Sequence, residues 1–221
     1  MSSEGAAAPP RPRGSRGLSL LGVIPLNGEA PAWEAADPGL GVRLVGYEDV
    51  AALVCSAPPE GADHDPLHVT ARHWEVHRAL LKGDVVPAPA GVVFAGDEEV
   101  AHFLTEAYAS LRAALARVRG RWEFRLHVDV VDAAFPQAKA LDLATHIYAE
   151  LRRAAGAALT FPPPGKPRVL SAAFLVERAA SDTFRDRVDQ LSALNPALEL
   201  DLTGPWPPYD FVAMQAPAKA E

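Results

Sequence analysis

Four histidines lie close together in the first half of the chain, and neutral imidazole is a common metal ligand. They are His64, His68, His73 and His77. His73 and His77 are four residues apart, so a helix would place both rings on one face, as a zinc site requires. The zinc-protease motif has its glutamate directly after the first histidine, whereas His73-Trp-Glu-Val-His77 has it in the middle. We therefore interpret these histidines as part of a solvated helix face and expect no metal.

The single cysteine, Cys55, is one candidate for a nucleophile. A nucleophilic thiol needs a partnered base and a lowered pKa. Cys55 instead follows Ala-Ala-Leu-Val, which is typical of a small buried apolar position. One cysteine cannot form an internal disulfide, which suits a reducing cytoplasm. We expect a structural role for this side chain.

Paired acids and clustered arginines offer no clearer chemistry. Acids in loops, at a helix start or at a strand end are explained by solvation and by the helix dipole. The chain also has no glycine loop that could cradle a phosphate, because Gly39-Leu-Gly41 lacks a third glycine and a following helix. We expect the arginine strip to pair with neighbouring acids, and we predict a non-enzyme without a cofactor. The acids are Asp63, Asp65, Glu98, Glu99, Asp129 and Asp132, and the strip is Arg117, Arg119, Arg121 and Arg125.

Composition excludes several classes of protein. The chain has 221 residues, a formal net charge of −7 and 49% hydrophobic residues. A nucleic-acid binder needs clustered lysine and arginine, so we expect no nucleic-acid partner. No apolar run approaches the roughly 20 residues of a transmembrane helix, so we expect no membrane partner either. The arginines at 11–16 followed by apolar Leu18–Ile24 superficially resemble a signal peptide, but Gly22 and Pro25 interrupt the run and no cleavage site follows.

The elements of the first half follow from hydrophobic periodicity. Residues 1–17 are rich in proline, glycine, alanine and serine, which predicts a disordered extension. Leu18–Ile24 reads as a buried strand, and two short strands follow over 42–45 and 50–55, although Asp49–Leu53 could instead start a helical turn. Apolar residues at helical spacing predict helices over 65–83 and 97–119, with a short hairpin between them. We expect this hairpin to pair Val85-Val86 with Val92-Val93-Phe94.

The second half alternates strands and helices. Phe124, Leu126, Val128 and Val130 alternate with charged residues, which predicts a strand with one wet face. A helix over 136–159, a buried strand over 169–177, a helix over 181–194 and a strand through Leu202 follow. This order predicts an α+β unit of ferredoxin-like type over 121–203. We expect an N-terminal α+β domain over 18–120, a distorted relative of it, and a proline and aromatic corner with a tail over 204–221.

The stretch from Thr203 to Phe211 reads Thr-Gly-Pro-Trp-Pro-Pro-Tyr-Asp-Phe. Its prolines and glycine oppose a regular helix, so its aromatic side chains are expected on a rigid turn. In one interpretation the turn is a latch whose rings pack on the preceding strand and whose Tyr209 hydroxyl bonds the backbone. In the other it is a docking surface made by Trp206, Pro207, Pro208 and Tyr209.

This stretch, preceded by Leu170-Ser-Ala-Ala-Phe-Leu-Val176, resembles the C-terminal signature of the gas vesicle accessory proteins of the F/L type. The helix around His77, the segment 85–94 and Gly120-Arg-Trp-Glu-Phe124 resemble the middle of that family. The similarity thus runs from about Leu18 to Phe211. Where the family usually has Pro-Leu-Arg-Phe-Gly-Thr, this chain has Pro87-Ala-Pro-Ala-Gly-Val92.

The resemblance implies two α+β domains and a function without catalysis. It implies a minor gas vesicle component or assembly factor that contacts the hydrophobic major shell protein, and other accessory proteins, in the cytoplasm. A second reading remains open, because paired ferredoxin-like domains commonly form ligand sites between them. In that reading the chain is a regulatory module that binds a small molecule.

Overall fold

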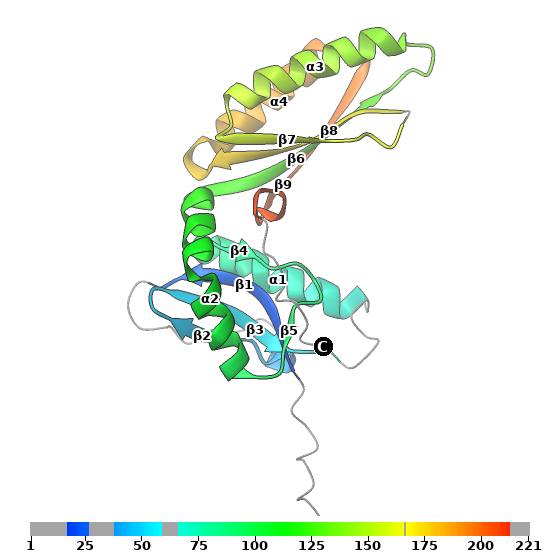
Figure 1. Cartoon of the computed structure of the whole chain (residues 1–221). Helices are drawn as coiled ribbons and strands as arrows, with labels where there is room; N and C mark the ends of the chain where they lie inside the picture. The colour runs from blue at the N-terminus through cyan, green and yellow to red at the C-terminus, as the bar shows by residue number, and fades with distance from the viewer. Residues whose placement is uncertain (1–16, 27–37, 59–65, 166, 213–221) are drawn as a thin grey trace, which may run out of the picture.

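The structure is a computed structural model that describes residues 17–26, 38–58, 66–165 and 167–212 (Figure 1). The predicted disordered extension lies outside these residues except for Gly17, whose carbonyl accepts a hydrogen bond from the Ala57 N–H at 2.7 Å. Two layered units follow each other along the chain, and a long helix leads from the first into the second. The chain is therefore of the α+β class, as predicted.

The N-terminal unit is built on an antiparallel sheet with the strand order β2-β3-β1-β4. β1 (Leu18–Pro25) pairs with β3 (Val50–Ser56), and β3 pairs with β2 (Arg43–Tyr47). Most residues of β1 and β3 are apolar at consecutive positions and are buried. Such strands need cover on both faces, because successive side chains point to opposite sides of a sheet.

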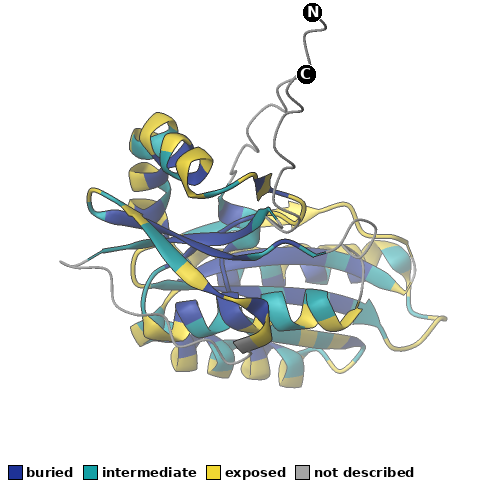
Figure 2. Cartoon of the chain, turned by 90° about the horizontal axis from the view of Figure 1, so that it is seen from below, coloured by how far each residue is buried: buried dark blue, intermediate teal, exposed yellow. Residues whose placement is uncertain are grey.

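The two faces of this sheet are covered by different helices. α1 (Pro66–Lys82) packs on one face, where its Val76 and Leu80 share a buried cluster with Leu21. α2 (Asp97–Val118) packs on the other face in a second cluster, which contains Leu20 and Leu104. Figure 2 shows the result, with buried strands in the middle and exposed residues on the outer sides of the helices. Both helices begin and end within two residues of their predicted bounds.

The prediction of a hairpin between these two helices is wrong. β4 (Val86–Pro87) and β5 (Val93–Phe94) do not pair with each other; both pair with β1. The intervening backbone also bonds β1, since the Ala88 N–H donates to the Leu21 carbonyl and the Leu20 N–H to the Val92 carbonyl, both at 2.9 Å. Both short segments thus satisfy their backbone hydrogen bonds at the edge of β1 that β3 leaves open. A hairpin between them is also disfavoured because Pro87 has no N–H to donate.

The C-terminal unit has a four-stranded antiparallel sheet with the order β7-β8-β6-β9. Its elements in chain order are β6 (Arg121–Val130), α3 (Gln137–Arg153), β7 (Ala157–Phe161), β8 (Arg168–Glu177), α4 (Ser181–Leu194) and β9 (Leu198–Trp206). This β-α-β-β-α-β succession is the element order of the ferredoxin-like type. The N-terminal unit runs β1-β2-β3-α1-β4-β5-α2, so its kinship with that type remains a prediction, as does the boundary at residue 120.

The helix predicted over 136–159 is too long. It ends at Arg153, and Ala157–Phe161 forms the strand β7, which pairs with β8. Alanine-rich sequence favours a helix, but Gly156 interrupts it and its N–H donates to the Leu175 carbonyl at 2.8 Å. Pairing with the buried strand β8 therefore overrides the local helix propensity.

Both helices of this unit cover one face of its sheet (Figure 1). Phe124, Phe174 and Phe184 are fully buried in this layer, with ring centroids of neighbouring pairs 5.4 to 5.7 Å apart. The opposite face carries the polar residues of β6 and, on β7, the partly exposed Leu159 and Phe161. This second face is the one turned toward the N-terminal unit.

An arginine joins the two units. The Arg178 guanidinium donates to the Gly83 carbonyl at 2.6 Å and to the Asp84 carboxylate at 3.0 Å, both just after α1. The same carboxylate accepts the Gly120 N–H at 2.8 Å, and the guanidinium lies 5.7 Å from the Trp122 ring centroid. One polar cluster thus fixes the end of α1 to the start of β6 and the end of β8.

Replacing this arginine tests the junction. Arg178→Met keeps the apolar stem but leaves the Gly83 carbonyl and the Asp84 carboxylate without their charged donor, so we expect unfolding to become easier by about 1 to 2 kcal/mol. Urea denaturation checks the value, with Arg153→Met, at an exposed position of α3, as the control. Equal stability of both variants would show that the junction depends on packing alone.

Candidate docking surface at the C-terminal corner

We call Thr203 to Phe211 the C-terminal corner. Its first half is not a free turn, because β9 continues to Trp206 and pairs with β6, with Thr203 opposite Arg125 and Trp206 opposite Glu123. A register shift separates these two pairs, and the Gly204–Pro205 peptide is cis. The second half contains a single 3-10 turn over Tyr209–Phe211. The predicted rigid turn is therefore confined to the second half of the corner.

Gly204 is required where the corner bends. Its φ is 124°, which side-chain-bearing residues rarely adopt. A Cβ there would lie 2.8 Å from the Glu123 carbonyl oxygen and 3.1 Å from the Phe124 ring. The Gly204 carbonyl in turn accepts a hydrogen bond from Arg185 of α4 at 2.7 Å. Close approach of β9 to β6 at this point thus depends on the missing side chain.

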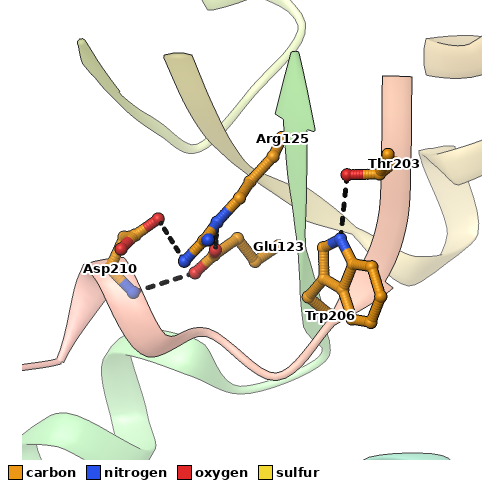
Figure 3. Close-up of polar contacts among 5 residues, drawn as sticks. All are labelled: Glu123, Arg125, Thr203, Trp206 and Asp210. Atoms are coloured by element: carbon orange, nitrogen blue, oxygen red, sulfur yellow. Dashed lines mark hydrogen bonds and ion pairs between the residues drawn. The ribbon is translucent and has the colours of Figure 1, made fainter. Parts of the chain in front are cut away.

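A buried carboxylate holds the second half of the corner (Figure 3). Glu123 on β6 is 0% exposed and accepts hydrogen bonds from Arg125 Nε and from the Asp210 backbone N–H, both at 2.9 Å. The Asp210 carboxylate forms an ion pair of 2.9 Å with Arg125 Nη2. We call Glu123, Arg125 and Asp210 the carboxylate clamp. The face of β6 that was predicted to be wet is covered here by the corner.

Burial raises the pKa of Glu123 to about 7, because the ionised form loses its hydration. The nearby Asp210 carboxylate also raises this pKa, whereas the Asp210 N–H and Arg125 oppose the shift by bonding the ionised form. The Glu123 carboxyl therefore changes protonation near neutral pH.

The four residues predicted to bind a partner face different ways. Pro207 and Pro208 are buried, and Tyr209 is half-buried. Trp206 is 44% exposed, and its indole N–H donates to the Thr203 hydroxyl at 3.0 Å. Beyond them, Phe211 packs on Ala173 and Leu175 of β8. The prolines and Phe211 are thus packed in the interior, while the Trp206 ring is partly exposed to solvent.

Tyr209 reaches across to the N-terminal unit. Its hydroxyl lies 3.3 Å from His73 Nδ1 on α1, so its partner is a side chain and not the backbone group that the latch interpretation expected. The two rings meet edge to face at 5.8 Å, and burial raises the pKa of the Tyr209 hydroxyl to about 12. The corner therefore contacts both units.

A pocket of about 230 Å³ lies beside this contact. α1, Tyr209 and the loop 88–91 line it, so the segment that departs from the family pattern forms one wall. Small-molecule sites usually have roughly 300 to 1,000 Å³. Because this pocket is smaller than that range, it gives little support to the ligand-module interpretation.

Of the histidines first considered for chemistry, His68 and His73 line the pocket beside Tyr209. His73 contacts Tyr209, whereas His77 stacks on Trp74 with ring centroids 5.9 Å apart. His64 lies outside the described residues, and within the described part of the chain no three potential metal ligands come together. Cys55 is buried, as predicted, and burial raises the pKa of its thiol, opposite to what a nucleophile needs.

The acids also have structural partners. Asp129 forms two hydrogen bonds with Arg168, at 2.9 and 3.0 Å, which lower its pKa. Asp132 accepts the Ala134 N–H at 2.8 Å, and Glu99 accepts the Ala95 N–H near the start of α2. Asp63 and Asp65 are outside the described residues.

Among the described helices, none is long and apolar enough to cross a membrane.

The carboxylate clamp was missed by sequence reasoning. Arg125 was expected to pair with an acid, and it does, but neither Glu123 nor Asp210 was singled out. The sequence signal for it was Glu123 between Trp122 and Phe124 at the start of a strand. An acid buried among such apolar residues requires a hydrogen-bonding or charged partner.

Comparison with known proteins agrees with the architecture. The family described as gas vesicle synthesis protein GvpL/GvpF matches residues 18–140 and 132–213. Gas vesicle protein L of Streptomyces sp. is 26% identical, over 86% of this chain and 90% of its own length. Gas vesicle protein F2 of Halobacterium salinarum is 27% identical, over 76% of this chain and 78% of its own length.

Two solved structures have the same fold. The gas vesicle protein GvpF of Anabaena sp. PCC7120 superposes with a TM-score of 0.77 at 18% identity, covering 90% of this chain and 97% of that one. GvpF of Microcystis aeruginosa gives a TM-score of 0.77 at 15% identity, covering 90% and 100%. Since the family match spans nearly all described residues, the chain belongs to the gas vesicle GvpL/GvpF family.

Proposed function

We propose that this chain is a non-catalytic minor component or assembly factor of gas vesicles that binds the hydrophobic major shell protein during vesicle nucleation or growth. It acts in the cytoplasm, associated with the vesicle, and other gas vesicle accessory proteins are further partners. Family membership supports a gas vesicle role, and among the residues considered for chemistry Asp129 is paired with Arg168 and Cys55 is buried.

The physical task explains why such a partner is needed. A shell protein with apolar helices and strands aggregates unless its apolar surface and strand edges are covered before it joins the ordered wall. An acidic protein with net charge −7 stays soluble while it presents a small apolar contact.

The observation that carries the proposal is the position of Trp206. This exposed indole stands at the end of β9, which is an edge strand of the C-terminal sheet. Its bond to Thr203 and the buried prolines after it fix its orientation, so little conformational freedom is lost on binding. A tryptophan of fixed orientation beside β9, whose outer edge pairs with no other described strand, suits addition of a partner strand anchored by one aromatic side chain.

We expect Trp206→Ala to weaken binding to the major shell protein by roughly tenfold or more, as loss of an aromatic anchor does. Quantitative pull-down of purified protein on immobilised shell protein measures the affinity. The fold of the variant is checked by circular dichroism, and Leu194→Ala, at an exposed leucine of α4, is the control.

This experiment distinguishes failure of the docking role of Trp206 from failure of the proposed function as a whole. Equal binding by wild type and Trp206→Ala would keep the assembly role and make the corner a latch. If wild type neither bound the shell protein nor delayed its aggregation, the proposed function would be wrong.

A further inference from the structure

The segment that follows β9 lies between the two units (Figure 1). We call residues 207–212 the strap. Tyr209 meets His73 of α1, Phe211 packs on β8, and Val212 packs against the buried cluster that α2 forms with the N-terminal sheet. The strap therefore links the two units at a second place, in addition to the junction at the end of α1.

The strap can leave this position without disturbing a strand. β9 ends at Trp206, so the strap takes part in no strand pairing of the described sheets. The N–H groups of Tyr209 and Phe211 donate to carbonyls within the strap, whereas the Asp210 N–H donates to the Glu123 carboxylate. Terminal segments with few such bonds open at a lower free energy than the whole fold. The carboxylate clamp is therefore the polar contact that holds the strap on β6.

The clamp brings two carboxyl groups to one guanidinium (Figure 3). Burial raises the pKa of Glu123 to about 7, and the Asp210 carboxylate adds to this rise through its charge and through a hydrogen bond with the protonated form. Arg125 contacts both carboxylates, so its single charge offsets only one of them. When both groups are ionised, the closed strap covers a carboxylate that water would hydrate if the strap moved away.

The other ionisable groups around the clamp come from the strap, from α1 and from the adjoining ends of β6 and β8. They are Tyr209, Arg72, His73, Arg121 and Glu177. Burial raises the pKa of Tyr209 to about 12, so its hydroxyl stays protonated between pH 5 and pH 8. β8 and β9 place the uncharged Leu175 and Trp206 opposite Glu123. A variant that lacks only the Glu123 carboxyl therefore separates its titration from that of these groups.

We propose that the clamp controls the strap by pH, holding it closed over β6 when the Glu123 carboxyl carries a proton and releasing it when both carboxyls are ionised. Release uncovers Ala173 and Leu175, which Phe211 covers in the closed strap. The two units then stay joined through α2 and the Arg178 junction. This motion belongs to the chain itself and does not depend on binding of the shell protein.

Hydrogen exchange of the native full-length protein, followed by mass spectrometry of the peptide that contains the strap, measures this opening. The rates are corrected for the intrinsic effect of pH on amide exchange. From pH 5 to pH 8 we expect the protection of the strap to fall by roughly tenfold or more, because the proton held by Glu123 in the closed state is lost as the pH rises through 7. In Glu123→Gln, which has no carboxyl to titrate, we expect a change of less than about threefold.

The strands beneath the strap show whether it moves alone. At every pH the amides of β6 and β8 should be protected at least roughly tenfold more strongly than those of the strap, because they exchange only in larger openings. Addition of about 1 M urea should speed exchange in these strands and leave the strap almost unchanged, since release of the strap exposes little surface.

The proposal is overturned if the protection of the strap depends on pH equally in wild type and in Glu123→Gln. It is also overturned if the strap and the two strands are equally protected, because the strap would then leave only on global unfolding. If Glu123→Gln does not fold, Asp210→Asn provides the test. Without the neighbouring carboxylate the midpoint of the change should move to lower pH, and an unmoved midpoint would contradict the proposal.

Discussion

Gly204→Ala is expected to lower the free energy of unfolding by about 3 kcal/mol. The added Cβ would lie 2.8 Å from the Glu123 carbonyl oxygen, which belongs to the backbone of β6 and cannot turn away. The φ of 124° adds strain for any residue with a side chain. Chemical denaturation followed by circular dichroism measures the change.

Gly165→Ala separates the two causes. Gly165 also has a left-handed φ of 104°, but nothing lies within 4 Å of its added Cβ. It should therefore show only the conformational strain, about 1 kcal/mol. If both variants lost the same stability, the close approach of β9 to β6 would contribute nothing to the cost of a side chain at position 204.

The second large effect is a dependence of stability on pH that arises from Glu123. Its pKa rises from 4.5 to about 7 on folding, so the folded state binds more protons than the unfolded state between these values. The stabilising contribution is complete below pH 4.5 and is lost as the pH rises through 7, which makes unfolding easier at higher pH. The total change is on the order of 3 kcal/mol.

Glu123→Gln isolates this effect from that of every other ionisable group. The amide keeps an oxygen acceptor for the Asp210 N–H but has no charge to desolvate. Urea denaturation of both proteins at pH 5, 6, 7 and 8 should show their stability difference shifting in favour of the variant as the pH rises. A difference that stays constant with pH would mean that Glu123 titrates at its ordinary pKa in the fold.

Local patterns predicted the buried and strongly periodic elements. β1 and β8 read as apolar runs because they are covered on both faces, and α2 carries a long stripe that ends near Gly120. The end of the helix predicted over 136–159 falls in β7, and only pairing with β8 makes this segment a strand. β4 and β5 are too short to carry a period, so their partner β1 could not be recognised.

The corner shows the same limit at the level of the site. Its composition indicated a rigid aromatic turn, and the exposed Trp206 agrees with a docking role that still awaits its test. The clamp joins Glu123 to Asp210 across 87 positions of sequence, and no local spacing encodes such a contact. Burial of the Glu123 carboxylate follows only from the way the corner folds back over β6.

The position of the corner also affects how the protein emerges from the ribosome. β9 and the clamp partner Asp210 are translated after every other described strand, so the nascent C-terminal sheet has β6 as an open edge until they appear. During this interval Glu123 lacks the Asp210 N–H that it bonds in the finished fold. An unfinished chain therefore exposes a strand edge that can pair with other chains, and synthesis of the last segment closes it.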